Sequence, residues 1–160
     1  LRGQRMKKLN FMIILGLILT APTSALADVA DDVIALAKAQ WAAELANAPA
    51  AKVMETVAED YTEFNPQYPS RLDGKALNNK FAEAAEKDKA KLIVAEMANP
   101  KVQVYGDVAI LTYNFMGATQ NTDGTISQTT AKSTRVYAKQ NGDWMLVHAN
   151  FAPVTNSPDN

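Results

Sequence analysis

Hydrophobic side chains follow a helical spacing after residue 28. They recur every three to five residues, at positions Val29, Val33, Leu36, Trp41 and Leu45. Apolar residues at this spacing fall on one face of a helix. The pattern therefore predicts an amphipathic helix whose apolar face is turned toward a core.

Breaks and shorter helices follow this first helix. Asn47-Ala48-Pro49 ends it, and Pro49 suits the first turn of a second short helix that carries Val53 and Val57. Asn65-Pro66, Tyr68-Pro69 and Asp73-Gly74 are loop signals. A third helix is predicted after them, with one apolar side made of Leu77, Phe81 and Ala85.

After Lys91 the hydrophobic period becomes two, which is typical of strands. The expected strands are 92–98, 102–105, 108–118, 126–139 and 144–151. The turn signals between them suit hairpins, and Asn141-Gly142 is the strongest. Helices followed by such a meander predict an α+β domain in which helices cover one face of a curved antiparallel sheet.

The N-terminus has the order of a secretory signal peptide. Lys7-Lys8 is followed by the apolar run Phe11–Leu19 and by the small-x-small sequence Ala25-Leu26-Ala27. The run is shorter than the roughly 20 residues of a membrane span. We expect a signal peptide over 1–27, with 1–5 as extra residues ahead of Met6, a domain over 28–154 and a flexible tail over 155–160. The expected location is the bacterial periplasm or the cell exterior.

Charge and composition exclude several function classes. Four of the 16 basic residues lie within 1–27, which leaves 12 basic against 17 acidic side chains in the remaining chain. An acidic domain argues against nucleic acid as a partner and against an anionic membrane once the signal is removed. The absence of cysteine excludes disulfides and thiolate chemistry. His148 is the single histidine, which excludes a multi-histidine metal site, and the sequence shows no carboxylate cluster that it could join. Neither a metal nor a cofactor is expected.

Five segments together resemble one known family. They are Thr-Glu-Phe-Asn-Pro at 62–66, Gly74 seven residues before Phe81, Asn-Pro-Lys-Val-Gln-Val-Tyr-Gly-Asp at 99–107, Thr-Arg-Val-Tyr at 134–137 and Gly-Asp-Trp-Met-Leu-Val-His at 142–148. In order and spacing they are similar to the association domain of calcium/calmodulin-dependent protein kinase II. That domain falls within the nuclear transport factor 2-like superfamily, which includes SnoaL-like polyketide cyclases.

The resemblance implies a cone, in which a bent antiparallel sheet wraps around the N-terminal helices and encloses a pocket. It also implies an outer sheet face used for subunit contact, and hence a homodimer or larger even oligomer in which Val136 belongs to the contact face. Kinase activity is not implied, because the chain lacks a glycine-rich loop and a His-Arg-Asp motif.

The family's pocket is lined by arginines, of which only Arg135 carries over. Phe115 and Phe151 stand at the other matching positions, and Asn65 stands where the family has an acid. We therefore expect a mostly apolar pocket for a small ligand with a hydrophobic body and one anionic group. Its candidate lining residues are Arg135, Phe81, Phe115, Tyr137, Phe151, Asn65 and Glu96. Alternatively, Arg135 pairs internally with Glu96 or another acid, or is a solvated strand residue.

The alternation of side chains along the last strand follows from the same assignment. If Arg135 and Phe151 point into the cone, strict alternation puts Val147 and Ala149 inside and His148 outside, unless a bulge reverses it.

Three function classes remain open. The favoured one is an exported, non-catalytic oligomeric module with a small-molecule pocket, and no catalytic residue is assigned. The alternative is an isomerase, cyclase or hydrolase that uses the same pocket, with Glu96 as the candidate interior acid, because superfamily isomerases use acids inside the cone. A purely structural envelope protein ranks last.

Export is expected to remove residues 1–27 and to leave Asp28 as the N-terminus, because a signal peptidase cuts after the small-x-small sequence. Intact-mass measurement of the exported protein checks this. A mature protein that still contains Phe11–Leu19 would contradict it.

Overall fold

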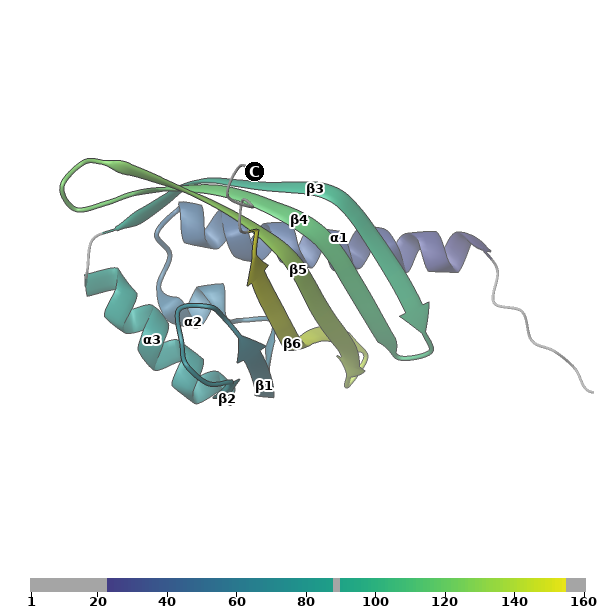
Figure 1. Ribbon diagram of the computed structural model, residues 1–160. Helices are drawn as coiled ribbons and strands as arrows, with labels where there is room; N and C mark the ends of the chain where they lie inside the picture. Colours follow the sequence, from purple (N-terminus) through teal and green to yellow (C-terminus); the bar gives the residue numbers. More distant parts are fainter. Residues whose placement is uncertain (1–22, 88–89, 155–160) are drawn as a thin grey trace, which may run out of the picture.

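The computed structural model describes residues 23–87 and 90–154. Within them, helices come first and long strands last, as the hydrophobic pattern predicts (Figure 1). The elements are α1 (Thr23–Leu45), α2 (Ala50–Val53), β1 (Val57–Phe64), β2 (Leu72–Asp73), α3 (Lys75–Lys87), β3 (Lys91–Tyr105), β4 (Val108–Gln120), β5 (Ile126–Gln140) and β6 (Asp143–Pro153).

The strands form one six-stranded sheet in the order β2-β1-β6-β5-β4-β3. Strands β3 to β6 are the predicted antiparallel meander. Helix α1 runs along the inner face of these long, curved strands, and α2 and α3 lie at the side where β1 and β2 complete the sheet (Figure 1). The predicted α+β cone, with a curved sheet around the N-terminal helix, is confirmed.

Helix α1 contributes a buried stripe to the core. Val33, Ala37 and Trp41 recur every four residues and are buried against the inner face of the sheet. Around them lie Val57, Tyr61, Leu111, Tyr113, Tyr137, Leu146 and Ala149. Leu45, predicted to continue the stripe, is exposed, because the helix ends there.

The predicted signal peptide overlaps α1. The helix begins at Thr23, while the expected cleavage site after Ala27 lies among exposed residues, ahead of Val33 as the first buried side chain. Cleavage would therefore leave the buried stripe intact. Residues 1–22 and the tail 155–160 lie outside the described residues, and the signal peptide stays a prediction. Among the described helices, none is long and apolar enough to cross a membrane.

The second predicted helix is shorter than expected, because its sequence is divided between a helix and a strand. Helix α2 ends at Val53, and Val57 begins β1, where it pairs with Leu146 of β6. This pairing is parallel, which the sequence analysis did not predict. A single turn of helix has little stability by itself, whereas a strand at this position buries Val57 and Ala58 and pairs with the sheet.

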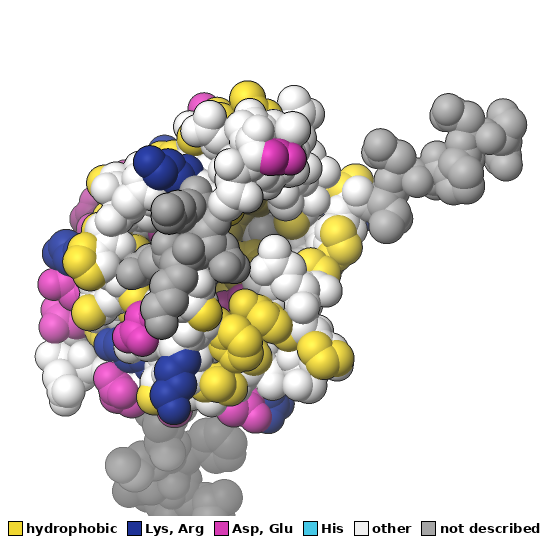
Figure 2. Space-filling model, turned by 90° about the vertical axis from the view of Figure 1, so that its left-hand side faces the viewer, with side chains coloured by type: hydrophobic (Ala, Val, Ile, Leu, Met, Phe, Trp, Pro, Cys, Tyr) yellow, Lys and Arg dark blue, Asp and Glu magenta, His cyan; other side chains and the backbone are white. Residues whose placement is uncertain are grey.

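The apolar side predicted for the third helix does not face the core. On α3, Leu77 and Phe81 are exposed, whereas Asn78 is buried and its Nδ2 donates to the Gly74 carbonyl at 3.1 Å. Hydrophobic side chains gather on the end of the molecule to which α3 belongs (Figure 2). The helix therefore presents part of its apolar surface to solvent.

Two irregularities shape the long strands. At Asn99-Pro100 the register of β3 against β4 shifts, with Asn99 at a positive φ of 51°, and the two strands expected here are one bent strand. At the other end, Asn141 and Gly142 both have positive φ, as a tight hairpin turn requires.

A bulge lies between β5 and β6. Val136 pairs with His148 and Tyr137 pairs with Leu146, so Val147 is the extra residue. Ala149 points inward and His148 outward, as predicted. Before the bulge the alternation is reversed, so Leu146 is buried in place of the predicted Val147. His148 Nδ1 lies 2.8 Å from Thr62 Oγ1 of β1.

Candidate functional site

One row of residues across the sheet organises the interior. Arg135 of β5 pairs with Leu111 of β4 on one side and with Ala149 of β6 on the other, and Ala149 pairs with Glu63 of β1. Paired residues share a face of a sheet, so Arg135 and Glu63 stand on the inner face with only a methyl side chain between them. Arg135 is 3% exposed.

Neutral groups hold the Arg135 guanidinium. Its Nε donates to the Tyr113 hydroxyl at 2.9 Å, and its Nη1 donates to Gln40 Oε1 of α1 at 2.6 Å. Its Cζ lies 5.7 Å from the ring centroids of both Trp41 and Phe151, which is within cation–π range. The side chain is therefore anchored at two atoms and faced by aromatic rings.

The guanidinium keeps unused hydrogen-bonding capacity. Two of its five N–H donors make the hydrogen bonds to Tyr113 and Gln40, and the Tyr137 hydroxyl is a third polar neighbour in hydrogen-bonding reach, which leaves other donors without a partner among the described residues. None of the ion pairs within 4 Å in the described chain includes Arg135. Burial would lower the pKa of Arg135, but the hydroxyls of Tyr113 and Tyr137 and the carboxylate of Glu44 offset this, so the pKa lies above its usual range. Arg135 is thus neither a solvated residue nor half of a close ion pair.

Two carboxylates share this interior. Glu44 lies one turn beyond Gln40 on α1, and burial raises the pKa of its carboxyl group, an effect that Arg135 opposes and Glu63 reinforces. Glu63 accepts hydrogen bonds from the Tyr61 hydroxyl at 2.8 Å and from Asn65 Nδ2 at 2.9 Å. Glu44 accepts no hydrogen bond from the described residues.

The tyrosines around the site are held in the protonated state. Burial raises the pKa of Tyr61, and the charge of Glu63 raises it further. Burial also raises the pKa of Tyr137, with Arg135 acting in the opposite direction. Their hydroxyls therefore remain hydrogen-bond donors at neutral pH.

Several of the predicted pocket residues come together. Arg135, Phe115, Tyr137 and Phe151 lie on the inner face, and the Trp41 ring connects them, with its centroid 5.3 Å from that of Phe115. The Phe115 ring lies over Gly117, where an added Cβ would come within 2.6 Å of it. Asn65 joins through its hydrogen bond to Glu63, described above.

Two candidates lie elsewhere. Phe81 is 37% exposed on α3, and its ring packs against Tyr68 with centroids 4.6 Å apart. Glu96 alternates with Ala95 and Met97, which pack against the core, so Glu96 is exposed on the outer face. The expectation that Glu96 is the interior acid is wrong, because the register of β3 turns it outward.

Sequence reasoning missed four polar residues of the interior: Gln40, Glu44, Glu63 and Tyr113. A signal existed for two of them. Gln40 and Glu44 are four residues apart and border the stripe of Val33, Ala37 and Trp41, so they lie at the edge of the buried face of α1. For Glu63 the signal was absent, because its position depends on the parallel pairing of β1 with β6.

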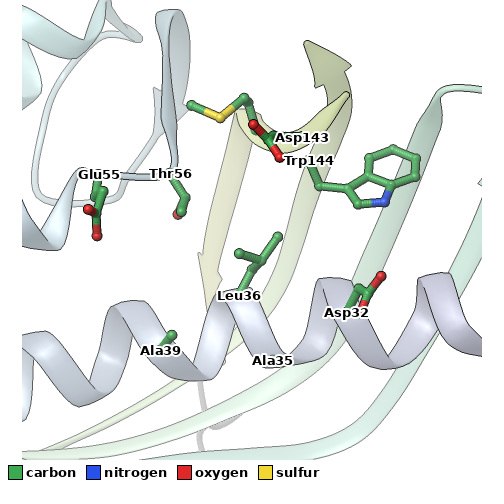
Figure 3. Close-up of a pocket in the computed structure, with 9 residues that line it drawn as sticks. Asp32, Ala35, Leu36, Ala39, Glu55, Thr56, Asp143 and Trp144 are labelled. Carbon is green, nitrogen blue, oxygen red and sulfur yellow. The ribbon is translucent and has the colours of Figure 1, made fainter. Parts of the chain in front are cut away.

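Arg135 itself lines neither of two depressions in the described surface. The larger, of about 560 Å³, is an acidic-rimmed groove between α1, the α2–β1 connection and the start of β6. Leu36 and Trp144 lie on its two sides, with Asp32 and Glu55 at its ends (Figure 3). The other, of about 350 Å³, lies over the outer sheet face at Thr112, Thr134 and Asn150. In the part of the chain that the structure describes, no group of three or more His, Cys, Asp or Glu residues is arranged to hold a metal ion.

Comparison with known proteins agrees with this architecture. Residues 30–154 match the family described as the calcium/calmodulin dependent protein kinase II association domain. No curated protein sequence matches the chain.

Solved structures with the same fold include proteins of different roles. A calcium/calmodulin-dependent protein kinase II hub homology domain from Chlamydomonas reinhardtii is 23% identical, with a TM-score of 0.66 over 79% of this chain and 98% of that one. A nuclear transport factor 2-like superfamily protein from Salmonella enterica is 17% identical, with a TM-score of 0.69 over 83% and 96%. A proposed dehydratase of the nuclear transport factor 2-like family from Streptomyces avermitilis is 16% identical, with a TM-score of 0.70 over 81% and 99%. At these identities the similarity shows the fold.

Glu44→Gln is expected to stabilise the protein at neutral pH. Because burial raises the pKa of Glu44 in the folded state, ionising it costs folding free energy. This cost is absent below the unfolded pKa of about 4.3, where both states are protonated, grows as the pH rises through the folded pKa, and is fully present above it. Thermal melting at several pH values measures the effect.

The variant should melt above the wild type at pH 8 and together with it near pH 4. Glu96→Gln, at an exposed carboxylate, is the control and should change neither value. A Glu44→Gln variant that melts below the wild type at pH 8 would show that the ionised carboxylate stabilises the fold through Arg135.

Proposed function

Because the chain belongs to the calcium/calmodulin-dependent protein kinase II association domain family, we propose that it is a self-associating, non-catalytic module that binds a small carboxylate-bearing molecule around Arg135. The bound group is recognised inside the cone, and assembly uses the outer face of the sheet. With the signal peptide that the sequence predicts, the module works in the periplasm or outside the cell.

The state of Arg135 is the observation that carries the binding proposal. A buried guanidinium is costly unless its donors are satisfied, and here the neutral partners Tyr113, Gln40 and Tyr137 satisfy only part of them. A carboxylate offers paired oxygens that match the planar fork of arginine. An anionic ligand would therefore supply hydrogen-bond acceptors that the described residues leave out.

The surroundings favour a ligand with an apolar body. The rings of Trp41 and Phe151 stand beside the guanidinium, and the Phe115 ring packs against Trp41. Small-molecule sites commonly combine such apolar walls with a few placed polar groups. Where the family resemblance implies further arginines, this chain has phenylalanines, which favours one anionic group over several.

Exposed apolar residues support self-association. On the outer face, Met116 of β4 and Phe64 of β1 are exposed, and Val136 of β5 is half-buried between Ile110 and His148. No helix of the described chain covers this face in Figure 1. Apolar surface on an uncovered sheet is typical of a subunit contact, and a symmetric pair is the simplest closed assembly.

One observation favours an enzyme as the second candidate. Glu44 is a half-buried carboxylate with a raised pKa, close to a cation and to hydroxyl donors. These are the properties of a general acid or base in an interior site. An isomerase, cyclase or hydrolase would need Glu44 for turnover, whereas a binding module would convert no ligand.

Replacement of Arg135 is expected to weaken the binding of an anionic ligand. Arg135→Ala should cost about 1.5–3 kcal/mol, the usual value of a hydrogen bond to a charged group. Arg135→Lys should recover little, because an ammonium lacks the planar fork. Native mass spectrometry of the protein purified from its own compartment, with calorimetric titration of phenylpropanoate as the defined probe, measures ligand retention and affinity.

Thermal melting of the same variants provides the control for folding. Because Arg135→Ala also leaves Tyr113 and Gln40 without a partner, the lysine variant is the decisive one if the alanine variant melts early. Normal melting with unchanged retention and affinity in Arg135→Lys would refute an arginine-dependent site.

Val136→Lys is expected to dissociate the assembly while the subunit stays folded. A lysine at the centre of a buried contact is unpaired and costs several kcal/mol, so the dissociation constant should rise on the order of tenfold or more. Light scattering at micromolar concentration measures the assembly, and far-ultraviolet circular dichroism measures folding. Gln128→Lys, near the β4–β5 hairpin tip, is the matched control. A wild-type monomer at this concentration would contradict the prediction.

A further inference from the structure

The interior around Arg135 contains groups of both charges, and we infer that its ligand is a zwitterion, namely a free α-amino acid with an apolar side chain. The inference rests on the proposed function, because it keeps the ligand's carboxylate on Arg135. It adds a second recognition element: the ammonium group of the ligand binds the carboxylate of Glu44.

The sheet register places opposite charges on one row of the inner face. Arg135, Ala149 and Glu63 are paired across three adjacent strands, which puts the Cα atoms of Arg135 and Glu63 about 10 Å apart at the usual strand spacing. Ala149 contributes only a methyl group between them. Neither Glu44 nor Glu63 lies within 4 Å of the guanidinium among the ion pairs of the described residues. The protein's own opposite charges therefore share the interior without forming a close ion pair.

The free hydrogen-bonding positions distinguish the two acids. Both oxygens of Glu63 already accept hydrogen bonds, from Tyr61 and Asn65. Glu44 accepts none from the described residues, although burial makes its ionised form costly. A primary ammonium carries three donors and a positive charge, so it would supply both the hydrogen bonds and the opposite charge that the Glu44 carboxylate needs. Glu44, rather than Glu63, is thus the partner of the ligand's ammonium.

Charge balance favours a zwitterion over a simple acid. A monocarboxylate beside Arg135 would place a third negative group near one guanidinium that Glu44 and Glu63 already face. Like charges in a poorly solvated site repel one another strongly. An α-amino acid has no net charge and bears its carboxylate and ammonium on the same carbon, so each group meets its counterpart without adding to the imbalance.

A buried hydroxyl provides an independent sign of a ligand. Ser133 lies two residues from Arg135 on the same inner face, is 3% exposed, and its Oγ has no hydrogen-bond partner in the described structure. Its register neighbours are Tyr113 and Phe151. A polar group buried without a partner is costly, and a ligand carboxylate on Arg135 would supply an acceptor nearby. The apolar side chain would pack on the rings of Trp41, Phe115 and Phe151.

The test compares matched ligands on the purified full-length protein. Phenylalanine and leucine are titrated in a calorimeter against their deaminated analogues, phenylpropanoate and isocaproate, and their decarboxylated analogues, phenethylamine and isoamylamine. At least one amino acid should bind about tenfold or more tightly than either of its analogues, as expected for one charge-assisted hydrogen bond. The same titrations are made on Glu44→Gln, on Arg135→Lys and on the exposed-carboxylate control Glu96→Gln.

The variants separate this inference from the proposed function. Glu44→Gln should lower amino-acid affinity to that of the deaminated acid and leave the acid's own affinity equal or higher. Arg135→Lys should weaken both, and Glu96→Gln neither. Equal binding of amino acid and deaminated acid, with no effect of Glu44→Gln, would overturn the zwitterion and leave the carboxylate site standing. Absence of Arg135-dependent binding for every ligand would overturn both.

Discussion

A guanidinium that lies inside a folded domain must be hydrogen-bonded where it is, because water cannot reach it. Arg135 meets this constraint by drawing partners from two distant elements, Tyr113 of β4 and Gln40 of α1. The same contacts tie the helix to the sheet at one point. Trp41, the next residue after Gln40, then adds its ring beside the guanidinium. The hydrogen bonds of Arg135 to Tyr113 and Gln40 therefore fix both the position of α1 in the cone and the position of the guanidinium charge.

The parallel pairing of β1 with β6 gives the interior its negative side. It brings Glu63 into register with Ala149, the β6 partner of Arg135, and the buried Tyr61 donates a hydrogen bond to Glu63. Glu44 approaches from the helix, so the two acids come from different elements and meet only in the folded state. Because the site lies between the helix and the sheet, small changes in the register of either element would separate its charges.

How far the sequence predicts this protein depends on the range of the interactions involved. The period-two strands and the Asn141-Gly142 turn were predictable, because side-chain alternation and positive-φ turns are local properties. The inward position of Arg135 was predictable through its family-like segment. Phe81 and Glu96 were placed incorrectly: the first lies on a helix that turns its apolar residues outward, and the second lies one position out of phase with the inward residues of β3.

By itself the sequence determined the class of the domain, the meander and the presence of one arginine among aromatic residues, since these follow from periodicity, turn chemistry and residue identity. Only the tertiary structure decided that 57–64 is a strand, that the bulge at Val147 turns Leu146 inward, and that Arg135 is hydrogen-bonded to Gln40 and shares a row of the sheet with Glu63. The physical reason is that strand pairing and burial are made between segments far apart in the chain. The partners of a buried charge are the groups that lie near it in the folded chain, and a local sequence pattern does not show which groups these are.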